Sequence, residues 1–78
     1  MKDKSVENLI RELHKVEGVT HVLPFNDILV IDFNKSRVLN GFNEEEFTSG
    51  IKKVIHSYGL KMLTEKTTNS KKIINLIA

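Results

Sequence analysis

The side chains of this chain that are able to do chemistry are three histidines, ten aspartates and glutamates, and hydroxyl groups, because the sequence contains no cysteine. One histidine and one carboxylate fall opposite each other on neighbouring predicted strands, namely His21 and Asp32. An aspartate can orient a histidine, but nucleophilic catalysis also requires a Ser, Thr or Cys within reach. Ser36 lies in a predicted loop without a nucleophile-elbow pattern. We therefore expect a cross-strand polar contact between His21 and Asp32. We predict no catalytic residue and no enzymatic activity.

Metal and cofactor sites are not predicted either. A metal site needs several His, Cys, Asp or Glu side chains that converge. His14, His21 and His56 are expected on a helix border, a strand face and the solvent side of a helix, so they do not converge. The four glycines stand singly and form no phosphate-binding loop. We expect no metal and no cofactor.

Charge is distributed unevenly along the chain. Residues 51–78 hold six lysines against Glu65 alone, a net charge of +5, whereas residues 1–50 have a net charge of −3. Clustered lysines predict weak, salt-sensitive binding of a polyanion such as nucleic acid. The residues of this alternative site are Lys52, Lys53, Lys61, Lys66, Lys71 and Lys72. The competing interpretation is a solvated surface that protects an edge strand.

Length and composition indicate one domain, residues 1–78, in a reducing compartment. No apolar run approaches 18 residues, and the first residues lack the apolar segment of a signal peptide. The sequence therefore predicts a soluble, cytoplasmic protein that does not bind membranes.

Two predicted helices and two predicted hairpins account for most of the chain. Val6, Leu9, Ile10, Leu13 and Val16 recur at helical spacing, and a second apolar stripe follows the predicted N-cap residue Asn43 and ends at Gly59. Four strands are expected at residues 19–25, 28–33, 60–66 and 72–77, with turns at 26–27 and 69–70. Pro24 and several charged residues favour edge positions for the first and third strands.

The second and fourth strands are apolar on both faces, which is typical of central strands. The prediction is an α+β fold, a two-layer sandwich in the order αββαββ. Its four-stranded antiparallel sheet has the order 1-2-4-3, and both helices lie on one face. This arrangement resembles a ferredoxin-like fold whose first strand has moved to the end of the chain. The resemblance concerns the fold alone and implies no function.

The first hairpin has one face that combines charge with large apolar side chains. A short turn pairs Phe25 with Ile28, Leu23 with Val30 and His21 with Asp32. Because Asp32 is costly to bury, this face should be open. The opposite face should meet the core, with Thr20, Val22, Pro24, Leu29, Ile31 and Phe33.

An exposed patch of four large apolar side chains usually marks an interface. Ile73 and Ile77, or alternatively Met62, would extend this patch. We therefore expect a small non-enzymatic protein-interaction module, such as a regulator, inhibitor or accessory subunit. It would bind a protein partner or form a homodimer. The predicted interface residues are His21, Leu23, Phe25, Ile28, Val30 and Asp32. Nucleic-acid binding through the lysines remains the alternative.

Overall fold

The computed structural model describes residues 3–77, which form two helices, one short 3-10 helix and a four-stranded sheet. The predicted order αββαββ is confirmed. The first helix is shorter than its apolar stripe, since it ends before Val16. The elements are α1 (Asp3–His14), β1 (Val19–Phe25), β2 (Ile28–Phe33), η1 (Lys35–Arg37), α2 (Glu44–Ser57), β3 (Lys61–Thr67) and β4 (Lys71–Ile77).

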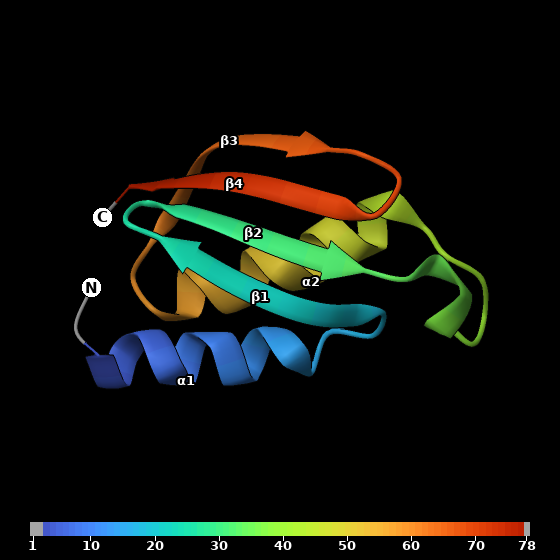
Figure 1. Ribbon diagram of the computed structural model, residues 1–78, viewed down its shortest axis with the longest axis horizontal. Coiled ribbons are helices and arrows are strands. Elements are labelled where there is room, and N and C mark those ends of the chain that lie inside the picture. Colours follow the sequence, from blue (N-terminus) through green and yellow to red (C-terminus); the bar gives the residue numbers. More distant parts are fainter. Residues whose placement is uncertain (1–2, 78) are drawn as a thin grey trace.

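The sheet is antiparallel throughout and has the strand order β1-β2-β4-β3, as predicted (Figure 1). The two strands that are apolar on both faces, β2 and β4, occupy the centre. The hairpin register is also confirmed, because His21 pairs with Asp32, and Phe25 pairs with Ile28. The start of α1 and the end of β4 lie at the same end of the molecule in both views.

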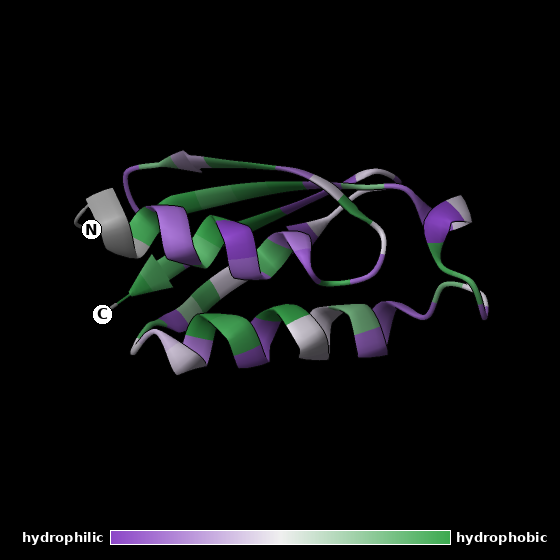
Figure 2. Ribbon diagram, turned by 90° about the horizontal axis from the view of Figure 1, so that it is seen from below, coloured by the Kyte–Doolittle hydropathy of each residue, from purple (hydrophilic) through white to green (hydrophobic). Residues whose placement is uncertain are grey.

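Both helices lie on one side of the sheet, so the molecule has two layers (Figure 2). α1 packs against β1 and α2, and α2 packs against β3. The buried apolar side chains come from both layers, which places the core between them. They are Leu9 and Leu13 of α1, Phe47, Ile51 and Ile55 of α2, and Val19, Val22, Leu29, Ile31, Phe33, Ile74 and Leu76 of the sheet.

The predicted core face of the first hairpin needs a correction in β1. The pairing is irregular between Val19 and His21, so one extra residue is inserted in the strand. As a result Val19 is buried, whereas Thr20, which was expected in the core, is only half-buried. Pro24 pairs with Leu29 but lies on the edge strand and remains exposed.

Local interactions at both ends of α2 hold its apolar stripe toward the sheet. At the start, Oδ1 of Asn43 accepts a hydrogen bond of 3.0 Å from the backbone N–H of Glu46. At the end, Gly59 adopts a positive φ of 76°, and its N–H donates to the carbonyl of His56. These contacts delimit α2, whose buried residues Phe47, Ile51 and Ile55 belong to the core between the two layers.

Candidate interaction face of the sheet

The face of the sheet opposite the helices is called the open face here. Strand register assigns it thirteen residues: His21, Leu23, Phe25, Ile28, Val30, Asp32, Lys61, Thr64, Lys66, Lys71, Ile73, Asn75 and Ile77. Figure 1 looks onto this face, and no element among residues 3–77 covers it. All six side chains that the sequence predicts for the interface lie on it, and each is exposed or half-buried.

Apolar side chains gather on the open face. The exposed fraction is 56% for Phe25, 48% for Leu23, 38% for Ile28 and 49% for Ile77. Val30 and Ile73, which are directly paired and half-buried, lie in the central strands. Hydrocarbon left in water costs roughly 25 cal/mol per Å² relative to burial. The face therefore carries a favourable driving force for association.

The expected extension of the patch is partly corrected. Ile73 and Ile77 lie on the open face, whereas Met62 pairs with Leu76 and packs against the core. Two further large apolar side chains are exposed in the described chain, Leu63 at an irregularity of β3 and Leu39 in the loop after η1. Four of the six such side chains thus share one face.

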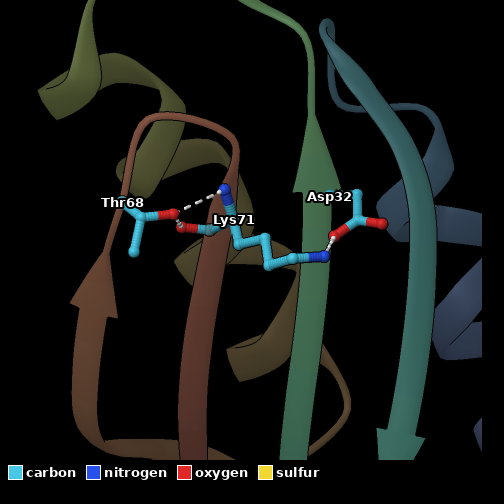
Figure 3. A network of polar contacts seen from close by, with 3 residues as sticks. All are labelled: Asp32, Thr68 and Lys71. Atoms are coloured by element: carbon cyan, nitrogen blue, oxygen red, sulfur yellow. Dashed lines mark hydrogen bonds and ion pairs between the residues drawn. The ribbon is translucent and has the colours of Figure 1, made fainter.

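An ion pair lies at the end of the open face nearest η1. Nζ of Lys71 is 2.8 Å from Oδ1 of Asp32, and the lysine side chain reaches across from β4 to β2 (Figure 3). The turn before β4 holds Lys71 in place, because its backbone N–H donates to Oγ1 of Thr68 at 3.1 Å. The backbone N–H of Thr68 donates to the carbonyl of Lys71 at 2.8 Å. The backbone of Lys71 is therefore held by hydrogen bonds to Thr68 on both its N–H and its carbonyl group.

Sequence reasoning missed this ion pair. His21 is the cross-strand neighbour of Asp32 in β1, as predicted, but Lys71 is its neighbour in β4 and binds the carboxylate. Asp32 pairs with Lys71, the first residue of β4. A prediction of the register between the two central strands would have found the ion pair. In this arrangement the hydrogen bond to the carboxylate comes from the ammonium group of Lys71, and His21 is its neighbour in strand register.

The prediction of Lys72 as part of a polyanion site is wrong. Its side chain is completely buried on the helix side of the sheet. Its Nζ donates to Oγ1 of Thr67 at 2.6 Å and to Oε1 of Glu65 at 3.2 Å. Because strand side chains alternate, Lys72 shares its face with Ile74 and Leu76, and Lys71 takes the other. Lys72 therefore cannot reach a polyanion.

The other five predicted lysines are exposed, but they do not form a single surface. Lys61, Lys66 and Lys71 lie on the open face, whereas Lys52 and Lys53 lie on α2 in the helix layer. The exposed lysines of residues 51–78 are thus divided between the sheet layer and the helix layer.

The two edge strands are poorly suited to pairing with another strand. β1 contains Pro24, which lacks an N–H group, and an irregularity beside Thr20. β3 has its own irregularity beside Leu63 and carries Lys61 and Lys66 on the open side. Irregularities, proline and lysines are the usual means by which edges avoid association. A partner is therefore better received by the open face than by an edge.

One concave region adjoins the open face. It lies between the start of β1, the end of β2, η1 and the β3–β4 turn. Its charged and ionisable lining consists of His21, Asp32, Lys35, Arg37 and Lys71. Across residues 3–77, no three His, Asp or Glu side chains are grouped so that they could hold a metal ion. Neither described helix is long and apolar enough to cross a membrane.

Comparison with known proteins adds no relative, since no family model, curated protein or solved structure matches this chain. The resemblance to a permuted ferredoxin-like fold therefore stays a prediction.

Proposed function

We propose that this chain is a small non-enzymatic protein-interaction module that binds through its open face, either to another protein or to a second copy. The observation that carries the proposal is the exposure of Leu23, Phe25, Ile28 and Ile77 on one uncovered face. A contiguous apolar patch on a small protein usually marks an interface. The protected edges support the face as the binding surface.

The distribution of apolar residues supports the same proposal. The buried residues of the core come from both helices and from β1, β2 and β4. The apolar side chains of the open face contribute little to that core. Burial by a partner would give these side chains a role, and it would add buried area to a domain of marginal size.

A cross-linking experiment tests this proposal. Phe25 is more than half exposed, so it can be replaced by the photoreactive analogue benzoylphenylalanine with little effect on the core. Irradiation of cells that make this variant is expected to yield a covalent adduct with a protein. The same analogue at Leu39, which is 90% exposed in the loop, gives the background. Adducts at Phe25 that do not exceed this background would contradict the proposal.

Val30→Glu is expected to reduce the Phe25 adduct at least about tenfold. Val30 pairs with Leu23 on one side and Ile73 on the other, so the substitution places a charge in the middle of the apolar patch. The variant should keep its circular dichroism spectrum, because Val30 faces away from the core. Leu39→Glu is the matched control and should leave the adduct unchanged. A Val30→Glu chain that unfolds would mean that this face is part of the core.

A second candidate function is weak binding of single-stranded nucleic acid in the concave region. The observation that favours it is the meeting of Lys35 and Arg37 of η1 with Lys71 of β4 in one concavity. Asp32, the only carboxylate in that lining, is already paired with Lys71. Phosphate oxygens would accept hydrogen bonds from the lysine and arginine side chains. This cluster draws on both halves of the sequence and replaces the one expected from residues 51–78.

Titration with an oligonucleotide at several salt concentrations tests the second candidate. The double variant Lys35→Gln, Arg37→Gln should bind more weakly. The slope of log K against log salt should also fall by about 0.7 for each lost phosphate contact. The double variant Lys52→Gln, Lys53→Gln removes the same charge from α2 and should behave like the unmodified protein. Absence of binding at low salt would eliminate this candidate.

A further inference from the structure

We infer that the occupant of the open face is a second copy of this chain, related to the first by a twofold axis that runs along the strands between β2 and β4. This inference rests on the proposed function and narrows it to self-association. It is carried by the arrangement of charge and hydrocarbon on the two central strands.

The two central strands present residues that complement each other under this rotation. The axis stacks β2 of one copy over β4 of the other and keeps each residue at the same level along the strands. Asp32 and Lys71 are cross-strand partners at one level, and Val30 and Ile73 are partners at the next. The rotation therefore places Asp32 over Lys71 of the second copy, and Val30 over Ile73. Each contact occurs twice, as a closed twofold interface requires.

The ion pair on the open face has bonding capacity left for this contact. The carboxylate of Asp32 and the ammonium group of Lys71 share one hydrogen bond of 2.8 Å, and their side chains are 27% and 50% exposed. A carboxylate accepts about four hydrogen bonds and an ammonium group donates three. Two such pairs stacked face to face alternate in sign, so that each charge meets two opposite charges. The additional hydrogen bonds and the alternation of sign offset part of the cost of removing the charges from water.

A twofold axis that runs across the strands gives a poorer match than the axis along them. An axis across the strands, centred on Val30 and Ile73, reverses the levels and places Asp32 over Ile28 of the second copy. That contact would bury a carboxylate against hydrocarbon, which is costly. Of these two axes, the pattern on β2 and β4 favours the one along the strands. This geometry is compatible with aligned packing of two sheets about 10 Å apart.

Lys66 of β3 is also accommodated by this axis. The rotation sets β3 of one copy over β1 of the other, so that Lys66 lies over Leu23 rather than over another lysine. A lysine can lay its aliphatic stem on apolar surface and keep its charge at the rim. At this position the rotation therefore brings no two lysines together.

Charge reversal followed by mixing tests the inference with purified full-length protein. Analytical ultracentrifugation should show a monomer–dimer equilibrium for the unmodified protein. Asp32→Lys alone places four positive charges together, and Lys71→Asp alone places four negative charges together. Each variant should dimerise about 100-fold more weakly. An equimolar mixture should recover the dimer, because the two lysines of one chain then face the two aspartates of the other.

Mixing separates contacts between copies from contacts within a chain, since the internal ion pair is absent from both variants. Glu12→Lys is the control, because it removes a comparable surface pair of 2.8 Å with Lys15 on α1 and should leave the dimer intact. A mixture that fails to associate, or an unmodified protein that stays monomeric at high micromolar concentration, would overturn the inference. If Phe25 cross-links to a different protein in that case, the proposed function stands without it.

Discussion

Replacement of Ile74 by alanine is expected to lower the free energy of unfolding by about 3 kcal/mol. Ile74 is completely buried in β4, where it pairs with Leu29 of β2 and Glu65 of β3. Truncation removes apolar contacts and leaves a cavity that the surrounding side chains fill only in part. Because a domain of this size has a stability of only a few kcal/mol, much of the chain should unfold. Urea unfolding followed by circular dichroism at low protein concentration measures the loss.

Ile73→Ala is the matched control for this prediction. Ile73 is the preceding residue, has the same side chain and lies half-buried on the open face. In the monomer its truncation should cost about 1 kcal/mol, clearly less than that of Ile74, because Ile73 lies on the open face and its loss leaves no enclosed cavity. At concentrations where the proposed dimer would form, the cost of Ile73→Ala should increase, whereas that of Ile74→Ala should not. Equal losses in the dilute monomer would mean that both faces are buried alike.

Removal of the carboxylate next to Lys72 is expected to give the second large loss of stability. Glu65→Ala leaves a fully buried ammonium group with Thr67 as its remaining described partner. Loss of one member of a buried pair typically costs 3–5 kcal/mol. We expect about 2 kcal/mol here, because the Glu65 side chain is 35% exposed and partly hydrated.

Lys72→Met is expected to be much milder than Glu65→Ala, although it breaks the same pair. Methionine keeps an unbranched apolar chain in the buried space and removes the charge that required compensation. Its stability should lie within about 1 kcal/mol of the unmodified protein, or above it. Urea unfolding of the two variants under identical conditions provides the comparison. Equal destabilisation by both substitutions would show that the ion pair itself contributes to stability.

Asp32→Ala provides the reference for an exposed pair. It removes the partner of Lys71, whose side chain is half exposed, so the dilute monomer should lose only about 0.2–1 kcal/mol. The contrast between Asp32 and Glu65 depends mainly on the burial of the lysine, because both carboxylates bind a lysine of β4 and the two lysines are adjacent in sequence.

The secondary structure and the strand order could be predicted because their determinants are local. Alternation and turn residues define the Asn26–Asp27 hairpin, and its register follows from the length of the turn. Asn43 and Gly59 delimit the second helix through hydrogen bonds to neighbouring backbone groups. The hydrophobicity of both faces of β2 and β4 was enough to place these strands in the centre. The open face followed from the cost of burying Asp32.

The tertiary structure decided what each charged residue contacts. A count of lysines in the sequence has no direction, so it grouped Lys71 and Lys72 in one basic surface. Strand alternation places them on opposite faces, and packing of the helices on one face then buries Lys72. The pairing of Asp32 with Lys71 joins residues 39 positions apart. Such pairings depend on the register between β2 and β4, which is set by packing of the whole sheet, and they give the open face its charge arrangement.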